Sequence, residues 1–323
     1  MRKEAALPSV FSRFAADVAY VQYVSTEEYS SSCPSCKGEP HPSGEWPDRC
    51  RWRLDYPPRG FCRRCGEMFW PNGGQTLSPE DVAHAIKEQE ERELARKRSS
   101  ERALAHLQSS LIWTKYYDDL DEHYRKIWRD RGIPDSLQSF WQLGCNRDFP
   151  YWHGGTEYHS PTITIPIFGE GWVPLNVKHR LLSPVDPGDK YRPEVRGLTQ
   201  GLFLTDPDTE LGGQVLLLEG EIKSMVVATT LGSGLGNVVG MPGKTPGKKV
   251  VEQLEAADSI TIVGDPDGRE AMWELCKAVG KQKCRVLIPD ERMGKIDDWI
   301  NKYHPSSDEL RWIIMQGAKP AWV

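Results

Sequence analysis

The spacing of hydrophobic residues changes twice along the chain, and each change predicts a different kind of structure. Residues 1–75 carry no long periodic pattern beyond an apolar segment from Val10 to Val24. A charged run over residues 83–107 follows, and Ser78 with Pro79 just before it suit the start of a helix. We expect a long, solvated helical connector, followed by a second helical stretch that ends near Pro134.

Further along, apolar and polar residues alternate on two neighbouring segments, 163–167 and 173–177. Between them lies Gly169-Glu170-Gly171, which can turn the chain. This pattern predicts a β-hairpin with one buried face. The other face would present polar side chains, namely Asn176, Lys178 and Arg180.

After residue 213, short apolar runs alternate with helical segments. Strands are expected at 215–218, 238–239, 260–263 and 286–288, and helices at 221–231, 246–256 and 269–279. This alternation predicts a parallel sheet that is covered by helices on both faces.

Length and charge narrow the class of protein. The chain has 323 residues, which predicts two or three domains. Its formal net charge is −5, so contact with nucleic acid would have to rest on local basic patches. Neither a membrane-spanning apolar stretch nor a secretory signal is recognisable, and we expect a cytoplasmic protein.

Four of the eight cysteines form two C-x-x-C pairs, Cys33 with Cys36 and Cys62 with Cys65. Two thiolate pairs at this spacing suit a closed tetrahedral zinc site, which is structural and not catalytic. Redox-active pairs are the alternative. The remaining cysteines have no partner at ligand spacing and are expected to be buried thiols.

Arginine and aromatic residues are interleaved in the segment between the two cysteine pairs. Arg51, Trp52 and Arg53 stand at its centre. Cations for phosphates and flat rings for base stacking are what single-stranded nucleic acid requires. A basic zinc-binding module that binds no nucleic acid is the alternative.

Acidic residues recur where the predicted strands end. They are Glu219, Asp265 with Asp267, and Asp297 with Asp298. The carboxyl ends of parallel strands share one edge of a sheet, so these acids could converge in space. Clustered carboxylates suit Mg²⁺ or Mn²⁺ and in-line phosphoryl transfer. Taken alone, the Asp-Pro-Asp-Gly sequence at 265–268 is also a good surface turn.

Taken in order, these motifs resemble a known family. Glu-Gly after one strand, Asp-x-Asp after a later one and the downstream acid pair look like the TOPRIM domain of bacterial and bacteriophage DNA primases, type IA topoisomerases and related nucleases. CPSC…DRCRW…GFCRRCG resembles the zinc ribbon of phage-type primases. WRDRGIPDSLQSFWQLG resembles the helical segment before the primase polymerase core, and TITIPIFGEGWVPLNVKHRL resembles the basic β subdomain of that core. The resemblance covers residues 30–305.

The resemblance implies an α/β protein with an N-terminal zinc ribbon, a helical connector, a mixed α+β basic subdomain and a TOPRIM-like parallel βα sheet. The implied divisions are a zinc-binding domain at 1–75, a helical connector and start of the polymerase core at 76–145, a basic β-rich subdomain at 146–212, a TOPRIM domain at 213–305 and a C-terminal tail at 306–323.

The resemblance also implies roles for individual residues. Glu219, Asp265 and Asp267 match its metal-binding and catalytic acids, and Asp297 or Asp298 matches its trailing metal-site acid. The basic segment that meets nucleotide and template contains Lys178, Arg180, Lys190 and Arg192.

There are two departures from the family pattern. Lys223, which we include among the catalytic candidates, stands where many primases have an aspartate. Gly268 follows Asp267 immediately, whereas many relatives place further residues before the glycine.

The resemblance therefore implies a DNA primase, a nucleotidyltransferase that makes short RNA primers on single-stranded DNA. Its cofactors would be structural Zn²⁺ and catalytic Mg²⁺ or Mn²⁺. Its ligands would be the template and NTPs, and a replicative helicase is considered as a partner. The alternatives are a TOPRIM nuclease or topoisomerase-like strand-cleaving enzyme, and a non-catalytic accessory protein that binds single-stranded nucleic acid.

Overall fold

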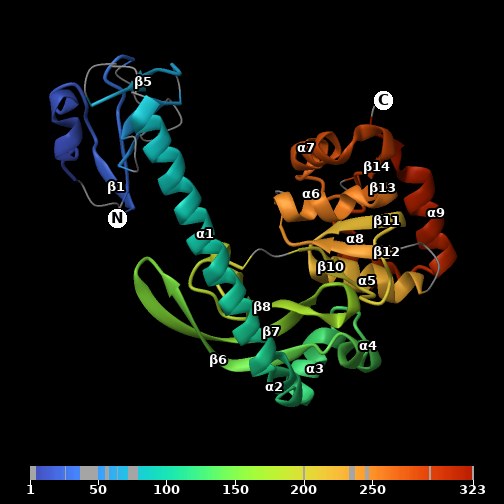
Figure 1. Ribbon diagram of the computed structural model, residues 1–323. Coiled ribbons are helices and arrows are strands. Elements are labelled where there is room, and N and C mark those ends of the chain that lie inside the picture. The colour runs from blue at the N-terminus through green and yellow to red at the C-terminus, as the bar shows by residue number, and fades with distance from the viewer. Residues whose placement is uncertain are drawn as a thin grey trace. The chain divides into compact units, whose positions relative to one another are not determined.

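The computed structural model describes residues 5–25, 27–36, 50–54, 58–63, 65–71, 79–198, 201–232, 237–243, 247–290 and 292–321. The chain divides into two compact units, residues 1–98 and 99–323 (Figure 1). Helix α1, Pro79–Ser110, crosses the boundary between them. The expected helix start at Ser78 lies outside the described residues. Within the described ranges, no helix is long and apolar enough to cross a membrane.

The first unit contains a five-stranded antiparallel sheet in which the strands follow their order in the chain. Aromatic side chains pack against the cysteines to form its core, with Phe11, Phe14, Trp52 and Phe69 at the centre. A short 3-10 helix, Ser9–Phe14, supplies the first two. The strands are β1 Gln22–Ser25, β2 Glu28–Ser31, β3 Cys50–Arg53, β4 Arg59–Cys62 and β5 Met68–Phe69.

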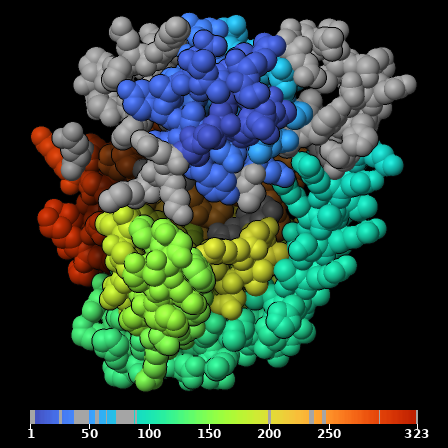
Figure 2. Space-filling model, turned by 90° about the vertical axis from the view of Figure 1, so that its left-hand side faces the viewer, coloured from blue at the N-terminus to red at the C-terminus, as the bar shows by residue number. Residues whose placement is uncertain are grey.

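Helix α1 is solvated over much of its length, as its charged sequence predicts. The side chains of residues 90–99 are all exposed. Figure 2 shows the side chains of this part of α1 standing out from the surface. At its end the helix gains a buried contact, because Leu107 packs in a cluster with Trp113 and Tyr116.

The second unit begins with three short helices and a four-stranded antiparallel sheet. The helices are α2 Ile112–Asp118, α3 Glu122–Arg129 and α4 Asp135–Phe140. The strands pair in chain order and are β6 Gly144–His153, β7 Thr156–Phe168, β8 Pro174–Leu181 and β9 Tyr191–Pro193. The predicted hairpin is therefore β7 and β8, and it is flanked by β6 and β9.

One part of the hairpin prediction is wrong, since its polar face is not presented to solvent. Asn176 and Lys178 are buried, at 0% and 6% exposure. The amide of Asn176 donates to the backbone carbonyl of Val195 at 3.0 Å. Each of the two side chains is buried with a polar partner, which is what burial of polar groups requires.

A six-stranded sheet forms the rest of the second unit, in the order β10-β12-β11-β13-β14-β15. Its four central strands are parallel, as predicted, whereas the edge strands β10 and β15 run antiparallel to their neighbours. The strands are β10 Phe203–Leu204, β11 Gly213–Glu219, β12 Asn237–Met241, β13 Ala257–Val263, β14 Cys284–Leu287 and β15 Lys319–Pro320. The helices are α5 Glu221–Leu231, α6 Lys248–Glu255, α7 Arg269–Val279, α8 Ile296–Tyr303 and α9 Ser307–Gly317.

Alternate residues of β11 point to opposite faces of this sheet, because side chains alternate along a strand. Leu216 and Leu218 pack in one core with α5, α8 and α9. Val215 and Leu217 pack in another core with α6 and α7. The prediction of helices on both faces is therefore confirmed. The C-terminal tail also packs on its own chain, because Leu310 and Ile314 of α9 are buried in the first of these cores.

Candidate active site

The acids that the sequence placed at strand ends lie around one cavity of about 780 Å³ in the second unit. Glu219 is the last residue of β11, and the other acids lie in the turn after β13 and in the first turn of α8. Segments up to 79 residues apart in the chain thus meet because parallel strands end on the same edge. The lining acids are Glu219, Glu221, Asp265, Asp267, Asp297 and Asp298.

The turn that carries Asp265 and Asp267 is closely packed. The backbone N–H of Gly268 donates to the carbonyl of Asp265 at 2.9 Å, which closes the turn. A Cβ on Gly268 would lie 3.4 Å from Oε2 of Glu219, so the Glu219 carboxylate lies against this turn. Asp265 is buried and Asp267 is exposed. Although Gly268 follows Asp267 directly, both acids therefore line the cavity, one buried and the other exposed to solvent.

The two most buried acids of the cavity are each held by a lysine. Nζ of Lys223 lies 2.6 Å from both carboxylate oxygens of Asp265. Nζ of Lys178 lies 2.7 and 2.8 Å from the oxygens of Glu221. Sequence reasoning missed Glu221, although its position directly after Glu219-Gly220 and at a helix start was a usable signal.

Asp297 is the acid with the clearest sign of a missing ligand. Its Oδ1 is buried and has no hydrogen-bond partner among the described residues. Burial raises the pKa of Asp297, an effect that Lys223 opposes and Asp298 reinforces. A buried acceptor without a donor calls for an explanation, and an oxygen ligand set suits a hard divalent cation. The residues present therefore fit Mg²⁺ or Mn²⁺.

As many basic side chains as acids line the cavity. Burial lowers the pKa of Lys190, and the nearby Arg180 and Lys295 lower it further. Burial likewise lowers the pKa of Arg131, again assisted by Arg180. Cations crowded in this way favour an anion among them. The lining bases are Arg131, Lys178, Arg180, Lys190, Lys223 and Lys295.

Arg131 and Lys295 were missed as site residues because nothing local marks them. Arg192, in contrast, was predicted with the nucleotide-facing group but lines a different cavity, of about 410 Å³. There it is ion-paired with Asp189, and its guanidinium lies 5.9 Å from the ring centroid of Tyr151. Lys178, Arg180 and Lys190 instead surround the ring of Tyr191, at 4.7, 5.7 and 5.9 Å from its centroid.

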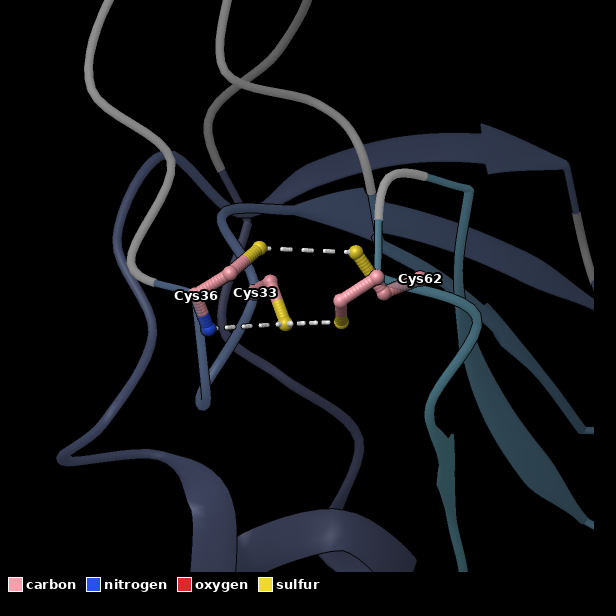
Figure 3. A group of neighbouring side chains, drawn as sticks. Cys33, Cys36 and Cys62 are labelled. Carbon is pink, nitrogen blue, oxygen red and sulfur yellow. Dashed lines mark hydrogen bonds between the residues drawn. The ribbon is translucent and has the colours of Figure 1, made fainter.

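The four predicted zinc ligands of the first unit lie together. Figure 3 shows Cys33, Cys36 and Cys62 of this group. Sγ of Cys33 lies 3.8 Å from Sγ of Cys65, and Sγ of Cys36 lies 3.7 Å from Sγ of Cys62. A tetrahedral ion with Zn–S bonds of about 2.3 Å requires sulfur–sulfur distances of about 3.8 Å. The four cysteines therefore form a zinc-binding site.

The predicted nucleic-acid residues beside this site differ in exposure. Trp52 is fully buried, contacts Phe11 and Phe14, and donates from Nε1 to Oγ of Ser31 at 2.7 Å. It belongs to the core, so the prediction that it stacks on a base is wrong for this structure. Arg53 is exposed, and Arg51 is half-buried in an ion pair with Glu28.

Comparison with solved structures defines the class of fold. Neither a protein-family model nor a curated protein matches the sequence. A structure of the DnaG primase catalytic domain bound to ssDNA matches with a TM-score of 0.54 at 18% identity, covering 69% of this chain and 84% of that one. A DNA primase domain from Pseudomonas aeruginosa matches with a TM-score of 0.52 at 19% identity, covering 67% of this chain and 79% of that one.

One of the matching structures covers both units. The zinc-binding and RNA polymerase domains of the Aquifex aeolicus primase match with a TM-score of 0.51 at 15% identity, covering 96% of this chain and 86% of that one. At these identities the likeness establishes the fold. The chain thus has a mixed α/β fold like that of the primase polymerase domain, together with a four-cysteine zinc-binding unit.

Proposed function

We propose that the protein is a DNA primase that joins ribonucleotides on a single-stranded DNA template. The observation that carries the proposal is the cavity in which Glu219, Asp265, Asp267 and Asp297 meet a ring of basic side chains. The primase folds that match this chain support it, as does the structure of one of them with ssDNA. On this proposal the βα sheet is a TOPRIM domain.

The basic side chains would hold the nucleotide. Burial lowers the pKa of Lys190, and Arg180 and Lys295 lie close enough to lower it further, so the three side chains together form a strong site for a triphosphate. Arg131 lines the same cavity from the end of the helical segment. These groups would orient the α-phosphate and withdraw charge from it, and such positioning is the main contribution a protein makes to phosphoryl transfer.

The acids would hold a divalent cation. Asp297 has a buried oxygen with no hydrogen-bond partner in the described part of the chain, and Glu219 lies against the Asp265–Gly268 turn. Asp267 and Asp298 complete the set. When bound, Mg²⁺ or Mn²⁺ supplies positive charge to the triphosphate and to the attacking 3′-hydroxyl oxygen.

The zinc-binding unit would contact the template through its arginines. Arg53 is exposed and would contact a phosphate, whereas Arg51 is half-buried beside Glu28 and the buried Trp52 offers no stacking surface. A replicative helicase as partner and a cytoplasmic location, in a phage-type enzyme, belong to the same proposal.

The test is a primer synthesis assay with single-stranded DNA, labelled NTPs and Mg²⁺ or Mn²⁺. The wild-type chain should yield short RNA products, and Asp265→Asn with Asp267→Asn should reduce the yield by at least about 100-fold. Asp258→Asn is the matched control, because Asp258 is exposed near the other end of the same strand β13. It should keep wild-type yield.

Two outcomes would overturn the proposal or its site. An absence of products from the wild-type chain on several templates would overturn the primase function, and cleavage of the template without NTPs would favour a nuclease. Products that persist in the doubly substituted chain would overturn the assignment of Asp265 and Asp267.

A further inference from the structure

Lys223 places an ammonium group inside the acidic part of the cavity. Its Nζ lies 2.6 Å from Oδ1 and 2.6 Å from Oδ2 of Asp265. The two side chains are 13% and 7% exposed, so water screens the pair only weakly. Both oxygens of this acid are therefore already bound by a positive charge that belongs to the chain.

The position of Lys223 is not explained by its own helix. It lies in the first turn of α5, where the helix macrodipole disfavours a cation. Its partner Asp265 comes 42 residues later in the chain, after β13. A residue that breaks a local preference and gains a distant partner inside a cavity is typical of a functional site.

The charge balance of the cavity also supports a functional role for Lys223. Six basic side chains face six acids, so the chain itself supplies much of the positive charge that clustered carboxylates need. An additional divalent cation on Asp265 would lie within about 5 Å of the Lys223 ammonium and be repelled by it. No such ammonium is bonded to Asp297, whose Oδ1 has no partner among the described residues.

We propose that Lys223 is a built-in cation that occupies the place of a divalent ion at Asp265. The cavity then holds a single Mg²⁺ or Mn²⁺ ion, at Asp297 and the acids beside it. Lys223 would hold the Asp265 carboxylate in place through its two hydrogen bonds but, unlike a metal ion, could not coordinate a phosphate oxygen. This inference rests on the proposed function and concerns how many ions its site takes.

The test counts bound Mn²⁺ on the full-length, zinc-loaded chain by calorimetry and electron paramagnetic resonance, without template or nucleotides. The wild-type chain should bind one Mn²⁺ ion in the cavity. Lys223→Met, which keeps the stem but removes the charge, should bind two, with the magnetic coupling expected for ions about 3.5–4 Å apart. Lys223→Asp should also bind two, and Lys223→Arg should stay at one.

Lys295→Met is the matched control. It removes one positive charge from the same cavity, and Lys295 forms no ion pair with Asp265 in the described part of the chain. Its count should remain one. Zinc content and circular dichroism identify any variant that fails to fold, in which case the other Lys223 variants decide.

Three results would overturn the inference. They are a wild-type count other than one, a count of one in both Lys223→Met and Lys223→Asp, and a second ion in Lys295→Met. The count is measured without nucleotides, so it is separate from the primase assay. A wild-type chain that binds one ion but makes no primers would overturn the proposed function, not the count.

Discussion

Lys178 on strand β8 and Glu221 at the start of helix α5 form a buried ion pair that joins the antiparallel sheet to the parallel one. Nζ of Lys178 donates to both carboxylate oxygens, at 2.7 and 2.8 Å, and to the carbonyl of Pro242 at 3.0 Å. The two side chains are 8% and 2% exposed. The polar face of the hairpin thus serves to hold the two halves of the cavity together.

The first prediction concerns this pair. Lys178→Met should lower the free energy of unfolding by about 3–5 kcal/mol, because it leaves the Glu221 carboxylate buried without its ammonium. Adding Glu221→Gln should restore much of the loss, since the uncompensated charge is removed. Urea unfolding of the single and double variants measures both changes.

Lys277→Met serves as the control, because Lys277 pairs with Glu274 on an exposed surface of α7. Its free energy of unfolding should change by less than about 1 kcal/mol. A Lys178→Met variant as stable as this control would contradict the structural role given to the pair.

Gly220 provides the second prediction. It links Glu219 to α5 with a φ of +92°, and a Cβ there would meet no atom within 4 Å. Gly220→Ala should therefore destabilise the protein through backbone strain alone, by about 1–2 kcal/mol. The melting temperature should fall by several degrees. Gly212→Ala, at another open position without a positive φ, should leave it unchanged or raise it.

A third prediction concerns the zinc-binding unit. Cys36→Ser should abolish stoichiometric zinc, measured by elemental analysis, and should unfold the sheet of residues 22–69, because a structural zinc site supplies much of the folding free energy of a small unit. Cys145→Ser is the control, since Cys145 is buried in the second unit and its thiol donates to the carbonyl of Asp119. If Cys36→Ser retained zinc, the ligand assignment would be wrong.

The fourth prediction is a pH dependence that arises at His179. Its ring is fully buried and stacked on Phe149, with Nε2 2.7 Å from Oε2 of Glu194. Burial lowers the pKa of His179 below 6.5. Burial alone would raise the pKa of Glu194, but hydrogen bonds from His179 and Tyr116 lower it overall.

Both shifts mean that the unfolded chain binds more protons than the folded one, so stability rises with pH. The contribution of His179 is present above about pH 6.5 and is lost as the pH falls below it. The urea midpoint of the wild type should therefore drop between about pH 7 and pH 5. His179→Gln should flatten this dependence, and the exposed His106→Gln should not. An unchanged slope in His179→Gln would assign the effect to other groups.

Several features could be predicted from the sequence because they depend on short-range patterns. The spacing of Cys33 and Cys36, and of Cys62 and Cys65, is local, and so is the alternation of apolar runs with helical segments. The acids could also be predicted to converge, because strand ends in a parallel sheet share an edge whatever the details of packing. These rules need only the order of the elements.

Tertiary structure decided what those rules do not contain. Trp52 looked like a stacking residue because arginines flank it, yet it is packed in the core of the first unit with Phe11 and Phe14. Lys178 looked like a ligand of nucleic acid, yet it is held by Glu221. In both cases the outcome depended on which distant group the fold brought into contact.

The sequence by itself determined the ligands of the zinc site, the parallel sheet and the edge at which its acids gather. Only the tertiary structure decided that Lys223 binds Asp265, that Arg131 and Lys295 face the same cavity, and that Arg192 does not. The physical reason is that burial and pairing energies belong to contacts between residues far apart in the chain, which no local pattern specifies.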